Sequence, residues 1–169
     1  MGLTIVEKIL GRTAGVKALA PGDIAVCRPD LVVAVDLTFA IDGLWYRPKS
    51  LFDRSKVALV FDHAVPAPSI KDAAGMVEAR RFAEQFGLEN VFDVGQHGIA
   101  HVLLAENGLA RPGELLLCAD SHTCAAGAFN CAGRGIASLD ILQAMTTGFT
   151  WYQVSPTVRY EFDGKLGPL

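Results

Sequence analysis

The sequence lacks the features that mark membrane, secreted and nucleic-acid-binding proteins. No apolar run is long enough to cross a bilayer, and Lys and Arg form no cluster. The net charge is −3 and the isoelectric point is about 5.8. Segment 1–10 is interrupted by Glu7 and Lys8 and lacks the basic-then-apolar pattern of a signal peptide. We therefore expect a cytoplasmic protein that contacts neither membrane nor nucleic acid.

Cysteine and several catalytic motifs are also scarce or missing. The four cysteines form no Cys-x-x-Cys pair, and a secreted disulfide scaffold would be smaller and richer in cysteine. We expect buried or partly buried free thiols. The Gly-x-Ser-x-Gly elbow, the Walker lysine and the dinucleotide fingerprint are absent. Serine hydrolases of that type and phosphate-loop proteins are therefore not supported.

What is present is a large apolar content. Of 169 residues, 51% are hydrophobic and 20% are charged, with a mean hydropathy of +0.32. This composition predicts one domain or lobe, spanning 1–169, with a substantial core. The surplus of apolar residues is expected to face another domain or subunit. Segment 160–169 is typical of a strand or the start of a hairpin without a closing element, so we expect a piece of a longer chain.

Strand and helix patterns alternate along the sequence. Apolar runs predict buried strands at 31–35, 57–61, 90–94 and 114–119. Helical periodicity and caps predict helices at 4–10, 69–86, 99–107 and 138–147. Segment 42–56 is expected to be a loop or partial helix. This order predicts an α/β fold, a three-layer α/β/α arrangement with a mostly parallel sheet.

Two of the predicted strands run into an acid–histidine pair. Asp62 and His63 follow one strand, and Asp120, Ser121 and His122 follow another. In open α/β sheets, ligands bind at the carboxyl ends of the strands. An aspartate bonded to an imidazole fixes its tautomer and suits acid–base work or metal ligation. We therefore expect a single active site at this edge, with histidines that converge there.

Simpler interpretations of the polar residues stay open. Asp120, Ser121 and Thr123 are also good helix N-caps. His97 and His101 have the spacing of two metal ligands on a helix, but the glutamate of the His-Glu-x-x-His motif is missing, and a glycine after His97 disfavours helix there.

The glycines at 127, 133 and 135 invite a phosphate-loop interpretation. Close packing of a helix or a flexible loop explains them more simply. Trp45 and Trp151 are expected to be packing residues.

Four short motifs follow one another along the chain. They are Phe-Asp-His with Val-Pro at 61–66, Gly-Gln-His-Gly-Ile-Ala-His at 95–101, Leu-Ala-Arg-Pro-Gly at 109–113, and Asp-Ser-His-Thr at 120–123 followed by Gly-Ala-Phe. Together they resemble the aconitase superfamily, and within it the large subunits of 3-isopropylmalate dehydratase and homoaconitase. The resemblance covers nearly the whole chain and implies an aconitase-like N-terminal lobe.

The resemblance implies a hydro-lyase that moves a hydroxyl group between adjacent carbons of a di- or tricarboxylate, such as 3-isopropylmalate or homocitrate. It also implies a [4Fe–4S] cluster whose one iron without a cysteine ligand acts as a Lewis acid. The implied partners are the remainder of the large subunit and a small subunit carrying a swivelling domain.

The resemblance also implies roles for individual residues. Asp62 and His63 match the pair that protonates the departing hydroxyl. His101, Asp120 and His122 match the groups that hydrogen-bond the iron-bound water or hydroxide. Ser121 is similar to the site serine of the family, whereas the proton-abstracting serine of the family lies on another domain or on the small subunit.

The chain departs from the family pattern in three places. The cluster cysteines of the family lie in a Cys-Thr-Asn element and a later Cys-x-x-Cys, and this chain contains neither, so its own cysteines are not expected to be ligands. Ala125 and Ala126 replace a threonine and a polar or aromatic residue. The segment at 35–38, where the family carries a glutamine, has none.

Two other functions remain open. The chain could be a non-catalytic binding or assembly domain that keeps the fold. It could also be a mononuclear metal hydrolase that uses His63, His97, His101 and Asp120. On the hydro-lyase interpretation, the isolated segment is expected to be inactive, because the cluster and the base lie outside it.

Overall fold

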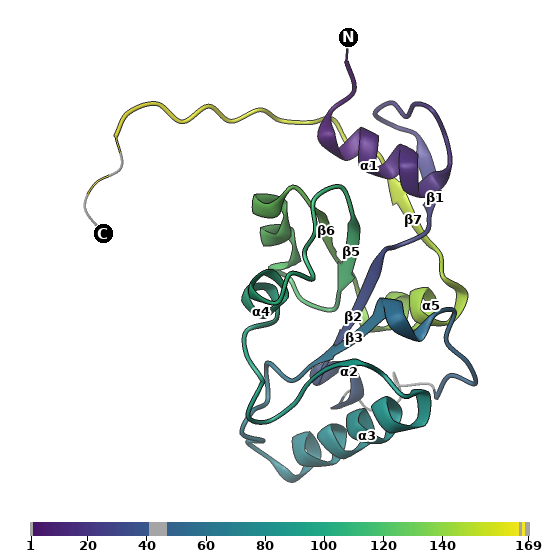
Figure 1. The fold of residues 1–169 in the computed structure, drawn as a ribbon, viewed down its shortest axis with the longest axis vertical. Helices are drawn as coiled ribbons and strands as arrows, with labels where there is room; N and C mark the ends of the chain where they lie inside the picture. The colour runs from purple at the N-terminus through teal and green to yellow at the C-terminus, as the bar shows by residue number, and fades with distance from the viewer. Residues whose placement is uncertain (1, 41–46, 166, 168–169) are drawn as a thin grey trace.

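The computed structural model describes residues 2–40, 47–165 and 167 (Figure 1). Its main sheet has five parallel strands in the order β4-β3-β2-β5-β6. Their bounds are β2 Leu31–Val35, β3 Val57–Val60, β4 Asn90–Phe92, β5 Leu115–Cys118 and β6 Ala132–Gly135. The predicted parallel sheet is therefore confirmed.

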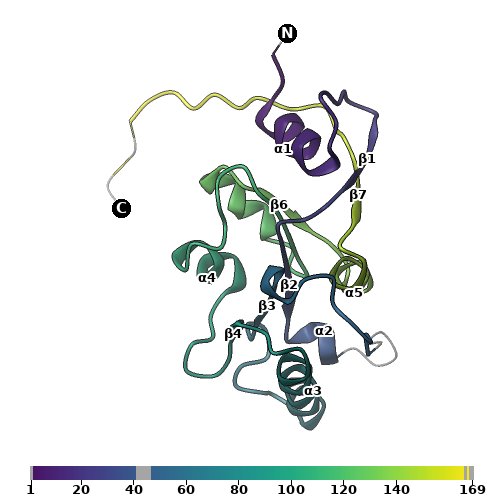
Figure 2. The same ribbon diagram turned by 45° about the vertical axis from the view of Figure 1, so that its right-hand side comes forward.

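Helices connect these strands, and a small second sheet lies beside them. The helices are α1 Ile5–Ala14, α2 Leu37–Ala40, α3 Ile70–Phe86, α4 Ala100–Glu106 and α5 Ser138–Thr147, with 3₁₀ turns η1 Arg54–Lys56 and η2 Thr123–Phe129. β1 (Ile24–Cys27) pairs with β7 (Thr150–Gln153) in antiparallel orientation next to α1 (Figure 2). Among the described helices, none has both the length and the apolar character needed to cross a membrane.

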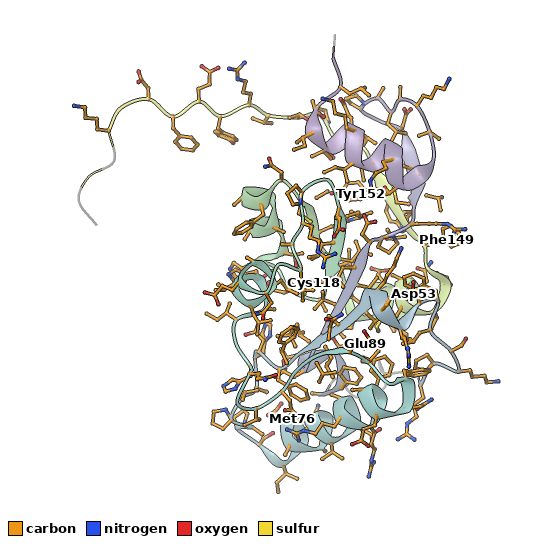
Figure 3. All side chains as sticks on the ribbon, viewed as in Figure 1. Asp53, Met76, Glu89, Cys118, Phe149 and Tyr152 are labelled. Carbon is orange, nitrogen blue, oxygen red and sulfur yellow. The ribbon has the colours of Figure 1, made fainter. Side chains whose placement is uncertain are left out.

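Two buried cores, one on each face of the sheet, produce the three layers. Along β2, Val32 and Ala34 belong to the core shared with α1, α3 and α5, whereas Val33 and Val35 belong to the core shared with α4 and η2. Successive strand residues point to opposite faces, so a strand covered on both sides is apolar throughout. Side chains accordingly fill the space on both sides of the sheet (Figure 3).

Caps set the ends of two helices as the sequence predicts. Thr4 and Glu7 form the reciprocal capping box of α1, in which each side chain accepts the other residue's backbone amide. α3 begins after Ser69, whose hydroxyl accepts the Asp72 amide, and ends at Gly87 in the left-handed conformation. The helix predicted at 4–10 continues one further turn, to Ala14.

The strand order places the carboxyl ends of β2, β3 and β5 side by side. The chain builds β2, β3 and β4 outward in one direction and then returns to add β5 and β6 on the other side of β2. The order reverses between β2 and β5, which makes this the switch point where open α/β sheets bind ligands.

Several predictions about local structure were wrong. β1, β6 and β7 were not predicted, and residues 160–165 carry no strand. Trp151, expected to be a packing residue, is 53% exposed on β7, and the Arg134 guanidinium lies 5.4 Å from its ring centre. Trp45 and residues 42–46 of the expected loop lie outside the described residues, and the remainder, 47–56, is irregular except for η1.

Two of the three glycines in the 127–135 region, Gly133 and Gly135, serve close packing. A Cβ atom on Gly133 would lie 2.2 Å from the Thr123 carbonyl oxygen and 2.8 Å from the Ala126 Cβ, and one on Gly135 would lie 2.5 Å from the Asp120 carbonyl oxygen. β6 and η2 therefore approach each other only because β6 carries glycine there. Gly127, by contrast, has open space around it.

We expect Gly133→Ala to lower the free energy of unfolding by about 1–3 kcal/mol, because the added methyl group forces η2 away from β6. Gly127→Ala is the matched control and should leave stability unchanged or raise it by up to about 1 kcal/mol. Urea unfolding of the two variants and the parent measures both values. Equal stabilities for the two variants would contradict the packing role of Gly133.

Candidate active site

Asp120 lies at the centre of the site, just beyond the end of β5. Its side chain is only 4% exposed, and its Oδ2 accepts the backbone amide of His122. The Thr123 hydroxyl donates to the Asp120 carbonyl oxygen over 2.6 Å. These local bonds hold the loop between β5 and η2 and fix the carboxylate at the edge of the sheet.

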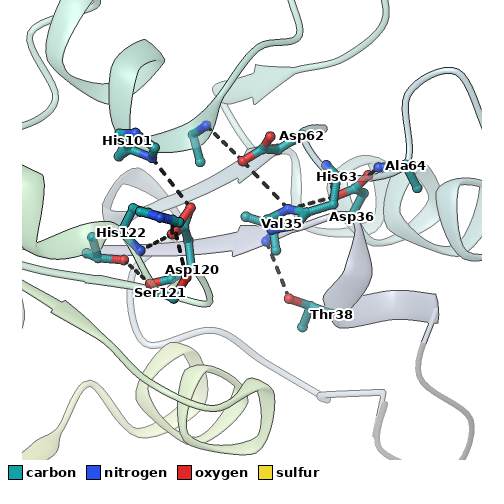
Figure 4. Close-up of polar contacts among 12 residues, drawn as sticks. Val35, Asp36, Thr38, Asp62, His63, Ala64, His101, Asp120, Ser121 and His122 are labelled. Atoms are coloured by element: carbon teal, nitrogen blue, oxygen red, sulfur yellow. Dashed lines mark hydrogen bonds and ion pairs between the residues drawn. The ribbon is translucent and has the colours of Figure 1, made fainter.

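Two histidines from different elements face this carboxylate. His101 on α4 has its Nδ1 3.6 Å from Asp120 Oδ1, and His122, which precedes η2, has its Nδ1 3.5 Å from Asp120 Oδ2 (Figure 4). The two imidazole ring centres are 5.3 Å apart, with an angle of 30° between their planes. His101 is three-quarters buried, whereas His122 is mostly exposed.

Asp62 and His63 bring the neighbouring strand end into the same site. The Nδ1 of His63 lies 3.6 Å from Asp62 Oδ2. The same carboxylate oxygen accepts the backbone amide of Ala100, the first residue of α4, over 2.9 Å. Asp62 therefore connects the end of β3 to the helix that carries His101.

Asp36 is a further residue at this site, and the sequence analysis did not assign it a role. Its side chain is 1% exposed, and its two oxygens accept the amides of His63 and Ala64 over 3.1 and 2.6 Å. Its Oδ1 also lies 3.8 Å from His63 Nδ1. A signal was available, because Asp36 follows an apolar strand as Asp62 and Asp120 do.

The structure brings all six predicted site residues to one edge of the sheet. Potential ligand atoms lie within 4.8 Å of one another in two groups, and both groups contain Asp120. The groups are His101, Asp120 and His122, and Asp62, His63 and Asp120. The Ser121 hydroxyl is 3.2 Å from His122 Nδ1. The three imidazoles that are far apart in sequence therefore converge.

His97 is in neither of these groups. It is exposed and precedes α4, and its Nδ1 accepts the Gly95 amide over 3.2 Å. The metal-hydrolase interpretation that relied on His97 therefore loses one of its ligands.

The interpretation of Asp120, Ser121 and Thr123 as helix caps holds in part. The Asp120 carboxylate accepts the backbone amide of His122. The side chain of His122, the residue directly before η2, makes no capping hydrogen bond.

An open cavity of about 380 Å³ adjoins the cluster of acids and histidines. Asp120, Ser121, Cys124 and Ile136 are among the residues that line it. The site is therefore accessible to a small molecule, with polar and apolar groups on its wall.

The cysteines do not fit as ligands of an iron–sulfur cluster. Burial, together with the nearby Asp120 carboxylate, raises the pKa of the Cys118 thiol to about 12. Burial likewise raises the pKa of Cys131 to about 11. A cluster needs thiolates, and no cysteine belongs to a group of potential metal ligands among the described residues.

Comparisons with known proteins show which family the chain belongs to. The model of the aconitase family (aconitate hydratase) matches residues 8–169. The chain is 55% identical to the 3-isopropylmalate dehydratase large subunit of Mycolicibacterium smegmatis, over 98% of this chain and 39% of that protein. It is 42% identical to the protein of the same name from Moorella thermoacetica, over 99% and 41%. It thus spans about two fifths of the length of these relatives, and it belongs to the aconitase family.

Proposed function

We propose that this lobe supplies the acid–base side of a hydro-lyase site that dehydrates and rehydrates a hydroxy dicarboxylate, with 3-isopropylmalate as the substrate. The observation that carries the proposal is the convergence of Asp62, His63, His101 and His122 around the Asp120 carboxylate at the switch point of the sheet. Relatives named 3-isopropylmalate dehydratase large subunit support the choice of substrate.

In this mechanism His63 protonates the departing hydroxyl group. Breaking the C–O bond expels hydroxide unless a proton reaches the oxygen, and a positioned imidazole supplies one. Asp62 and Asp36 both face the Nδ1 of His63, at 3.6 and 3.8 Å. They orient the ring and leave Nε2 to exchange the proton. In the reverse direction, His63 takes a proton from the attacking water.

His101, Asp120 and His122 hold the same oxygen after the bond breaks. The two imidazoles present N–H donors or acceptors on either side of one buried carboxylate. This arrangement hydrogen-bonds a water molecule or hydroxide and keeps it close to the substrate carbon for the return step. Ser121, next to His122, adds a hydroxyl donor at the rim of the cavity.

The remaining parts of the site would come from other segments. The base that removes the carbon-bound proton, and the [4Fe–4S] cluster that family resemblance implies, would belong to the remainder of the large subunit or to a small subunit. When bound, that cluster supplies a Lewis-acidic iron.

The proposal is tested by assaying the full-length chain together with its small subunit. We expect turnover of 3-isopropylmalate, seen as ultraviolet absorption of the unsaturated acid, and much slower turnover of homocitrate. Asp120→Asn should lower kcat at least about 100-fold, since it removes the charge that faces both histidines. Lack of turnover by a correctly assembled enzyme, or wild-type rates for Asp120→Asn, would favour the assembly-domain alternative.

A further inference from the structure

Another cavity, of about 280 Å³, lies at the opposite edge of the sheet from the candidate active site. Its wall includes Lys56 and Glu114, which directly precede β3 and β5, and Asn90, the first residue of β4. It therefore lies at the amino ends of these parallel strands, whereas Asp62 and Asp120 follow the carboxyl ends. Cavities that hold drug-sized ligands measure about 300–1,000 Å³, so this one suits a smaller metabolite.

Two cationic side chains line this cavity, Lys56 and Arg111. Neither forms an ion pair among the described residues. The Nε of Arg111 donates to the Gly108 carbonyl oxygen over 2.9 Å. This bond anchors the guanidinium and leaves its two terminal nitrogens available. A guanidinium presents such donors in the fork geometry that matches a carboxylate.

The two acidic side chains of the cavity, Asp30 and Glu114, differ in whether they are already paired. Arg12 contacts both carboxylate oxygens of Asp30, and the Leu115 amide donates to the same carboxylate over 2.8 Å. Asp30 and, less strongly, Glu114 raise the pKa of the Arg12 guanidinium, but Glu114 forms no ion pair in the described part of the chain. The half-buried Glu114 carboxylate is therefore the acidic group that remains for a ligand.

We propose that this cavity binds a free α-amino acid with a small apolar side chain. The carboxylate of the ligand pairs with Arg111 and Lys56, and its ammonium group pairs with Glu114. Leu31 and Leu109 also line the cavity and offer apolar contact to the side chain of the ligand. A zwitterion matches charges of both signs in one small cavity, whereas a simple anion leaves the acidic group unpaired and a simple cation leaves the basic groups unpaired.

Three ligands with the same branched carbon skeleton separate the two charges: valine, isovalerate, which lacks the ammonium group, and isobutylamine, which lacks the carboxylate. Each is titrated into the 169-residue chain, and the backbone amide signals are followed by NMR. The chain supplies both faces of its own core, which supports testing it alone. We expect saturable binding of valine, with amide shifts centred on residues 109–115. The other two ligands should bind at least about tenfold more weakly, because each loses a charge-assisted contact.

Substitutions test the two ends of the ligand separately. Glu114→Gln should weaken valine binding about tenfold or more and remove the preference for valine over isovalerate, and Arg111→Gln should weaken valine binding to a similar extent. Glu84→Gln and Arg81→Gln are the matched controls, because each removes an exposed charge on α3 away from the cavity wall. Neither control should change the affinity. Circular dichroism checks that all four variants fold.

The proposal is overturned if valine shows no saturable binding, if isovalerate or isobutylamine binds as tightly as valine, or if folded Glu114→Gln keeps the preference for valine. Loss of valine binding in either α3 control would also contradict it. The titration uses neither substrate nor turnover. A failed dehydratase assay therefore leaves this result standing, and a failed titration leaves the proposed dehydratase untouched.

Discussion

Replacing His63 by glutamine is expected to lower the kcat of the assembled dehydratase by about 10²–10⁴-fold, the usual contribution of a positioned acid or base. Glutamine keeps hydrogen-bonding groups near Asp62 and Asp36 but cannot deliver a proton. The side chain is 38% exposed, so the fold should tolerate the change. The dehydration rate of 3-isopropylmalate measures the effect, and KM is expected to change far less than kcat.

His97→Gln provides the matched control for this experiment. His97 is exposed, and its Nδ1 accepts the Gly95 amide within the same loop. Its replacement should leave kcat within about twofold of the parent, as for surface residues away from the chemistry. If the two glutamine variants have similar rates, His63 is not the proton donor.

Asp36→Ala is expected to lower the free energy of unfolding by about 2–4 kcal/mol, because it leaves the buried amides of His63 and Ala64 without their acceptors. Asp36→Asn keeps one acceptor oxygen and should have a smaller effect. Urea unfolding of the chain measures both. In the assembled enzyme, at a temperature where the variant is folded, kcat should fall more than KM rises, since the His63 ring loses its orientation.

Asp53→Ala is a suitable control for Asp36, because Asp53 also accepts a nearby backbone amide, that of Ser55, but does so at an exposed position. Water can replace an exposed acceptor, so this change should destabilise the chain less than Asp36→Ala does. Equal unfolding free energies for the two alanine variants would show that the Asp36 carboxylate does not support the His63 loop.

Much of the fold was predictable because the central strands are buried on both faces. Such strands are continuous apolar runs, and β2, β3 and β5 were predicted on that basis. Acids and histidines directly after these runs predicted the edge where the site lies. The capping box at the start of α1 and the Gly87 cap at the end of α3 involve residues close to a helix end, so local sequence predicted them as well.

β6 was missed because its sequence, Ala-Gly-Arg-Gly, has no strand signature. It is a strand because it pairs with the free edge of β5 and because its glycines admit the backbone of η2. β1 and β7 pair across more than a hundred residues of sequence. Such pairing depends on which segments the fold brings together, and local patterns do not contain it.

The sequence by itself determined the layered α/β fold and the edge of the sheet at which the acid–histidine pairs after β3 and β5 lie. Only the tertiary structure decided that His101 joins the site while His97 does not, and that Asp36 supports the His63 loop. The reason is that these relations are hydrogen bonds between distant segments, such as those from Ala100 to Asp62 and from His63 to Asp36. They exist only after the strands have packed in their final order.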